Sequence, residues 1–137
     1  MAFDPTSDYP LGTRRPDLVS TPGGLPLGGV TLAAVRSGKL AADEIRATPE
    51  TLRMQAEVAR AAGRTQLAES FERAAELAAV PDELLLEVYT ALRPRRATAI
   101  ELEEWAARLE AHDASNTAAF VREAAAAYAE RGLLADG

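Results

Sequence analysis

The single histidine, His112, is the first residue to consider for chemistry, because imidazole acts as acid, base or metal ligand near neutral pH. Its one adjacent carboxylate is Asp113, and the chain has no second histidine and no cysteine to complete a metal-ligand set. A position near the end of a predicted helix favours instead a cation that interacts with the helix dipole. We therefore expect His112 to be neither catalytic nor metal-binding.

The acidic residues follow the spacing of solvated helix faces. Glu69 and Arg73, and likewise Glu104 and Arg108, are four residues apart, as in ion pairs along an exposed helix. A catalytic carboxylate pair would need an apolar cleft to separate its two pKa values, and the pattern indicates none. The pair Gly28-Gly29 lacks the strand and the Lys-Ser/Thr signature of a phosphate loop. We predict no catalytic, cofactor-binding or metal-binding residue in this chain.

Two further groups have alternative interpretations. Arg93, Arg95 and Arg96 surround Pro94 and form the only basic cluster. Cations at the end of one helix are the first interpretation, and a carboxylate-binding contact with a partner is the second. Trp105 shares a predicted helix face with three aliphatic residues, so we expect it in the core rather than against a cofactor.

Composition narrows the class of protein. The 137 residues carry a net charge of −6, which disfavours nucleic acid as a partner. No apolar run approaches the ~18 residues of a membrane span, and the N-terminus lacks the regions of a signal peptide, so we expect a cytoplasmic protein. Alanine supplies 30 residues against seven aromatic ones, which favours an all-α fold with a shallow core.

The first thirty residues differ from the rest. They contain five prolines and five glycines, and proline disfavours helix both at its own position and at the preceding one. Large apolar residues recur through the segment, which a disordered tail would not need. We predict that residues 1–30 form an ordered, extended arm without helix, lying on its own domain or on a partner. The expected partner contacts are Tyr9, Leu11, Leu18 and Val19.

We predict that residues 31–137 form one helical domain. Thr31 caps a short helix that stops at Gly38. Thr48-Pro49-Glu50 is a strong helix start, and Thr98 with Glu101 matches a capping box. About five longer helices are predicted, over residues 49–62, 66–79, 82–93, 98–112 and 115–131.

Helical periodicity also assigns the faces of two of these helices. In the helix over residues 66–79 the predicted inward face consists of Leu67, Phe71, Ala74, Ala75 and Ala78. In the helix over residues 82–93, Leu86 lies off the apolar stripe formed by Leu84, Leu85, Val88, Tyr89 and Leu92. A helix with apolar residues on more than one side favours a packed centre or a docking face.

Several segments, taken in order along the chain, carry a resemblance to one protein family. The helical ones are TPETLRxQAExA (48–59), AGR (62–64), LAExFERAAEL (67–77), PDE (81–83), ALRP (91–94) and AFVREAA (119–125). Upstream, the matching segments are YPL (9–11), RPxLV (15–19) and TPxG (21–24). Over residues 9–131 these segments resemble the small subunits of adenosylcobalamin-dependent diol and glycerol dehydratases.

The resemblance implies a lyase built from large, medium and small subunits, usually two copies of each in a heterohexamer. Such enzymes convert 1,2-diols to aldehydes with loss of water: propane-1,2-diol gives propanal, and glycerol gives 3-hydroxypropanal. The diol site lies in the large subunit and adenosylcobalamin lies between the large and medium subunits. The small subunit is non-catalytic, binds no cofactor itself, and rests mainly on the large subunit, supporting its assembly and stability.

Longer family members carry an amphipathic extension before the YPL segment that is associated with packaging into bacterial microcompartments. This sequence lacks the extension, which weakens the expectation of packaging through this subunit. The resemblance also implies that preference for diol or glycerol is set in the large subunit.

A free-standing helical adaptor that binds another protein is the alternative function. Periodicity alone does not separate the two hypotheses. The ordered run of family segments favours the dehydratase subunit, and neighbouring genes for large and medium subunits would discriminate between them.

Overall fold

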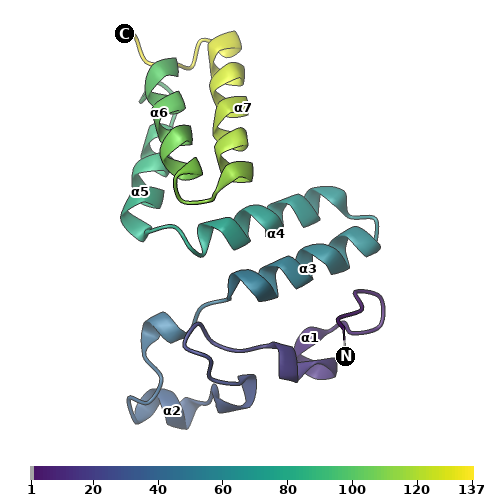
Figure 1. Ribbon diagram of the computed structural model, residues 1–137. Coiled ribbons are helices and arrows are strands. Elements are labelled where there is room, and N and C mark those ends of the chain that lie inside the picture. Colours follow the sequence, from purple (N-terminus) through teal and green to yellow (C-terminus); the bar gives the residue numbers. More distant parts are fainter. Residues whose placement is uncertain (1) are drawn as a thin grey trace. The chain divides into compact units, whose positions relative to one another are not determined.

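The structure is a computed structural model that describes residues 2–137. Over these residues the chain is helical and forms no strand, which confirms the predicted all-α class (Figure 1). The helices are α1 (Leu11–Arg14), α2 (Leu32–Arg36), α3 (Pro49–Ala61), α4 (Thr65–Leu77), α5 (Asp82–Ala91), α6 (Ala99–Glu110) and α7 (Ser115–Arg131). Three short 3-10 turns join them, η1 (Pro16–Leu18), η2 (Leu27–Gly29) and η3 (Ala42–Glu44). No helix among residues 2–137 combines the length and the apolar character needed to cross a bilayer.

The chain forms two compact units, which are described separately below. Unit 1 extends to Ala78, and unit 2 comprises Ala79–Gly137. The predicted boundary at residue 30 falls inside unit 1. The division into an arm (1–30) and one helical domain (31–137) stays a prediction.

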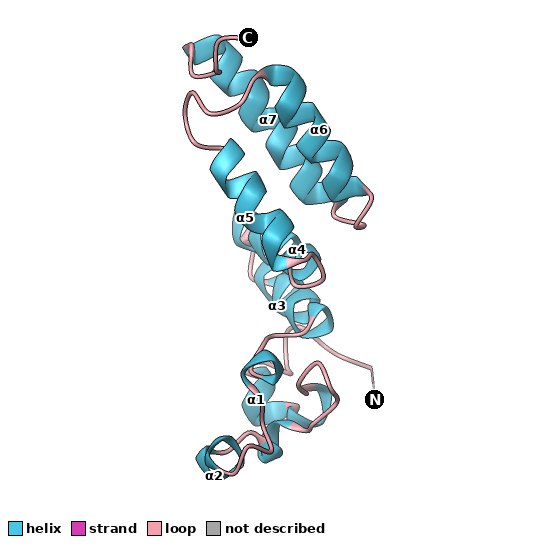
Figure 2. Cartoon of the chain, turned by 90° about the vertical axis from the view of Figure 1, so that its left-hand side faces the viewer, coloured by secondary structure: helices cyan, strands magenta, loops and turns pink. Residues whose placement is uncertain are grey.

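The centre of unit 1 is the helical hairpin of α3 and α4, which lie side by side (Figures 1 and 2). Helix α3 begins as predicted: the Thr48 side chain accepts a hydrogen bond from the Thr51 amide, and proline occupies the first helical position. Gly63 turns the chain between the helices at a φ of +75°. Between α3 and α4 three alanines are buried, with Phe71 packed against them: Ala56, Ala59 and Ala68.

The prediction that the arm contains no helix is wrong. It forms one helical turn, α1, and the 3-10 turns η1 and η2. Pro10 is the N-cap of α1, Pro16 is the first residue of η1, and Pro26 is the N-cap of η2. A proline at the start of a helical turn removes an N–H that would have no intrahelical partner, so the turn is not disrupted.

Unit 2 is built on the pair α6 and α7, with α5 packed against the same core. The pair lies side by side in both views (Figures 1 and 2). Helix α6 starts with the predicted capping box, in which Thr98 and Glu101 exchange hydrogen bonds with each other's backbone amides. Helix α7 ends at Gly132, which adopts the left-handed conformation. The buried core is continuous and contains Val80, Leu84, Val88, Ala91, Ala97, Leu102, Ala106, Leu109, Ala114, Ala118 and Val121.

Two predicted faces are only partly correct. In α4 the most buried residues are Ala68 and Ala75, whereas Leu67 is 42% exposed. The inward face is therefore rotated by about one residue from the predicted one. In α5, Leu86 is exposed as its position indicated, but Tyr89 is exposed as well. Trp105 packs against the core of unit 2, as predicted.

Candidate interaction site

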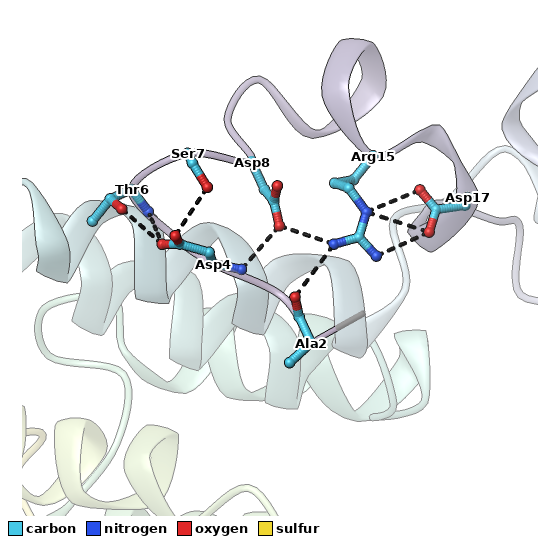
Figure 3. A network of polar contacts seen from close by, with 7 residues as sticks. All are labelled: Ala2, Asp4, Thr6, Ser7, Asp8, Arg15 and Asp17. Carbon is cyan, nitrogen blue, oxygen red and sulfur yellow. Dashed lines mark hydrogen bonds and ion pairs between the residues drawn. The ribbon is translucent and has the colours of Figure 1, made fainter.

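Arg15 organises the first part of the arm (Figure 3). Its guanidinium donates to Asp17 through Nε and Nη2, and to Asp8 Oδ2 through Nη1 at 2.9 Å. Asp8 in turn accepts from the amide of Asp4, and the Ala2 carbonyl accepts a longer bond from Arg15. The Arg15 side chain is only 12% exposed, so this network holds residues 2–17 together with a mostly buried cation.

Asp4 closes the turn before this network. Its carboxylate accepts hydrogen bonds from the Thr6 hydroxyl and amide and from the Ser7 hydroxyl (Figure 3). The Thr6 hydroxyl is the main cause of the lowered pKa of Asp4, and hydrogen bonding to Arg15 lowers the pKa of Asp17. Both groups are therefore held ionised well below neutral pH.

A second contact fastens the arm to the segment before α3. Glu44 Oε2 accepts from the Thr21 hydroxyl at 2.6 Å and from the Gly23 amide at 3.1 Å. Thr21 is buried, and its hydroxyl oxygen also accepts from the Leu25 amide. A Cβ at Gly23 would lie 2.6 Å from the Glu44 carboxylate, so only glycine allows this approach. We call this set the Glu44 contact.

The structure places the four predicted partner-contact residues differently from one another. Tyr9 is 52% exposed, and Leu18 and Val19 are half-buried. Leu11 is 3% exposed and so is already buried within this chain. Of the four, Leu11 therefore has no surface to offer a partner, and Tyr9 has the most. Partner contact itself stays a prediction for the set.

Val19 lines a groove of about 300 Å³ in unit 1. Its apolar wall is formed by Val19, Leu27 and Val30 from the arm together with Ile45, which is 55% exposed. Glu44 also lines the groove, but its carboxylate is engaged in the Glu44 contact. The groove is therefore suited to an apolar side chain rather than to a charged ligand.

The residues considered for chemistry are not assembled into a reactive constellation. His112 is exposed just beyond the end of α6. In residues 2–137 no three side chains of histidine, cysteine, aspartate or glutamate are grouped to hold a metal ion. Unit 2 contains a charged cluster of Arg122 with Glu103 and Glu110, at 2.7 and 2.6 Å. Hydrogen bonding to Arg122 lowers the pKa of both glutamates, as expected for surface ion pairs that connect α6 to α7.

Sequence reasoning missed Arg15 and Glu44. The partners of Glu44 are more than twenty residues away, so no local pattern indicates them. Arg15 carried a weak signal in Asp17, two residues on. Gly23 was counted only among the glycines of the arm, and no local pattern indicates that it leaves space for a carboxylate.

Comparison with known proteins adds to this geometry. The model of the dehydratase small subunit family matches residues 5–135. A propanediol dehydratase small subunit from Citrobacter freundii is 54% identical over 126 residues, covering 91% of this chain and 73% of that protein. One from Salmonella typhimurium is 53% identical with the same coverage. The match covers most of the arm and most of both units, and this chain belongs to the dehydratase small subunit family.

Proposed function

We propose that this chain is the non-catalytic small subunit of an adenosylcobalamin-dependent diol dehydratase in the cytoplasm, with propane-1,2-diol or glycerol as substrate. The observation that carries the proposal is the family match over residues 5–135, joined by identities above one half to two propanediol dehydratase small subunits. The subunit would support the assembly and stability of a large subunit, with a medium subunit completing the complex.

The described residues support a role without chemistry of its own. The grooves of the two units measure about 300 and 460 Å³, which is the lower end of the range for drug-sized ligands. Both volumes are smaller than the space that a corrin ring with its nucleotide and adenosyl groups would occupy. His112 lacks companion ligands at its helix end. The cofactor would therefore be held by the partner subunits.

The exposed apolar residues support a docking role. Unit 1 exposes Tyr9, Leu32 and Ile45, and unit 2 exposes Leu86, Tyr89 and Ile100, each at more than half of its surface. Exposed apolar side chains in this number favour burial against another protein. The chain also has an alanine-rich core in unit 1, which leaves part of its stability to such a partner.

Reconstitution tests the proposal. Large and medium dehydratase subunits are purified with and without this chain, and propane-1,2-diol conversion to propanal is measured with adenosylcobalamin. We expect capture of the large subunit by the chain, activity that depends on the chain, and neither activity nor cobalamin binding by the chain alone. Failure to capture either subunit, or full activity without the chain, would contradict the proposal.

Tyr9 provides a test of the arm that leaves the fold intact. Removal of residues 1–27 would delete the Arg15 network and Thr21, and would damage unit 1 itself. Tyr9→Ser changes an exposed side chain instead. We expect unchanged helicity and weaker capture of the large subunit. Thr13→Ala, at an exposed arm position, is the control.

A further inference from the structure

Three arginines lie together on the connection between α5 and α6. Arg93, Arg95 and Arg96 are all exposed, and within residues 2–137 no side chain forms an ion pair or hydrogen bond with their guanidinium groups. In the same unit, by contrast, Arg122 binds two glutamates and Arg108 pairs with Glu87. We call residues 93–96 the arginine turn.

The backbone of the arginine turn is fixed without these side chains. The Arg95 amide donates to the Leu133 carbonyl at 2.7 Å, and the Ala135 amide donates to the Ala97 carbonyl at 2.9 Å. The Tyr128 hydroxyl donates to the Leu92 carbonyl. The turn therefore lies at the same end of unit 2 as the C-terminal segment (Figure 2). The guanidinium groups are presented from an ordered base.

Arg95 occupies a backbone position that favours glycine. Its φ is +61°, in the left-handed region where a Cβ is strained. The amide contact to Leu133 uses only backbone atoms, so glycine would serve it equally well. One arginine would suffice to interact with the end of α5. A strained arginine beside two others indicates a use for the side chain.

An apolar groove of about 460 Å³ adjoins the turn. Its wall is formed by Leu86, Ala91 and Trp105, and Arg96 also lines it. Its two acidic residues are engaged within the chain: Glu101 in the capping box and Glu87 with Arg108. The positive charge at this edge of the groove comes from the three arginines of the turn, although unit 2 has eleven acidic and six basic residues.

We propose that the arginine turn and this groove bind a segment of another dehydratase subunit. The segment would place an aliphatic side chain between Leu86 and Trp105 and carboxylates on Arg95 and Arg96. Arginine binds carboxylates in two-pronged geometry, and an apolar anchor beside a charged rim is the usual construction of a protein interface. The proposal rests on the proposed function, because that function supplies the partner.

Charge reversal tests the site in the full-length chain mixed with the large and medium subunits. We expect Arg93→Glu/Arg95→Glu/Arg96→Glu to weaken capture at least tenfold. Raising the NaCl concentration should weaken capture by this variant less than it weakens capture by the unchanged chain. Leu86→Ser should weaken capture severalfold. Arg64→Glu, an exposed arginine of unit 1, is the matched control and should capture normally.

Arg95→Gly separates binding from folding. It relieves the left-handed backbone, so the melting temperature should stay equal or rise, while capture weakens severalfold. A purely structural arginine would not weaken capture. If the unchanged chain captures neither subunit, the proposed function is refuted. If the unchanged and the triply substituted chains capture equally well, this site alone is refuted. Binding of inorganic phosphate that the triple substitution abolishes, with capture unaffected, would also overturn it.

Discussion

Units 1 and 2 reach a folded state by different means. The helical pair of unit 1 encloses three alanines and one partly buried phenylalanine. Unit 2 encloses a continuous cluster of eleven residues that includes Leu102, Leu109 and Val121, each almost fully buried. Outside this pair, unit 1 also buries Leu11 and Leu40, and polar contacts hold its arm in place: the Arg15 network and the Glu44 contact.

The two units are therefore vulnerable to different kinds of substitution. Apolar burial is non-directional, and its loss scales with the volume removed. The polar contacts of unit 1 depend instead on single atoms in fixed positions, because a buried hydroxyl or carboxylate that loses its partner is left desolvated. Unit 2 should therefore respond most to cavities, and unit 1 to changes in geometry and charge.

A cavity in unit 2 should have the largest effect. Leu102→Ala removes a side chain that is 1% exposed, so we expect a loss of about 2–5 kcal/mol in the free energy of unfolding. Leu86→Ala, at 66% exposure on α5, should change it by no more than about 0.5 kcal/mol. Urea unfolding followed by circular dichroism measures both. Equal effects of the two substitutions would remove the basis of the comparison.

A single methyl group should break the Glu44 contact in unit 1. Gly23→Ala places a Cβ where the Glu44 carboxylate lies, so the bonds to Thr21 and to the residue 23 amide are lost. The expected cost is about 1–3 kcal/mol, the penalty for leaving a buried polar group unpaired. Gly28→Ala is the control, because a Cβ there meets no atom within 4 Å. Thermal melts and amide exchange over residues 20–27 measure the effect. Similar results for both glycines would argue against the contact.

One hydrogen bond in unit 2 should have a smaller effect. Tyr128→Phe removes the bond from the half-buried hydroxyl to the Leu92 carbonyl while the ring stays in the core. We expect a loss of about 0.5–1.5 kcal/mol. Tyr89→Phe changes an exposed tyrosine and should be neutral. If the two substitutions lowered the melting temperature equally, the Leu92 contact would not be the cause.

Lowering the pH should have the smallest effect on the melting temperature, and this effect should develop gradually with pH. The pKa values of Asp4 and Asp17 in unit 1 and of Glu103 and Glu110 in unit 2 lie below their usual range. A carboxyl whose folded pKa is depressed adds stability above its unfolded pKa of about 4 and loses it as the pH falls through the folded value. The melting temperature should therefore decline below about pH 4. Asp4→Asn should decline less over that range. An equal or steeper decline would contradict the assigned contacts.

Prediction from sequence succeeded where the signal is local. Thr48-Pro49-Glu50 and the Thr98–Glu101 box start α3 and α6 as expected, because a cap is decided within four residues. The face of α4 was off by one residue, with Leu67 exposed, because Ala68 fits the close approach of α3 better than a leucine. The spacing of residues along one helix gives no information on how closely the facing helix approaches it.

The candidate site was harder to predict, for a related reason. Tyr9 is exposed and Leu11 buried, although both are large apolar residues of the same arm. Which of them faces inward depends on where residues such as Glu44 fasten the arm, and these contacts join residues far apart in the chain. The basic cluster was visible in the sequence, but the left-handed backbone at Arg95 was not.

The closing of the arginine turn has a consequence for the order of events during synthesis. Residues 95 and 97 find their backbone partners, Leu133 and Ala135, thirty-eight positions later in the chain. Translation proceeds at about 5–20 residues per second, so for some seconds a nascent chain carries this turn with its partners still unmade. Unit 1 is complete before that, since its contacts end at Ala78. A nascent chain on a ribosome stalled after residue 125 should therefore have a folded unit 1, while the backbone contacts of the arginine turn have not yet formed.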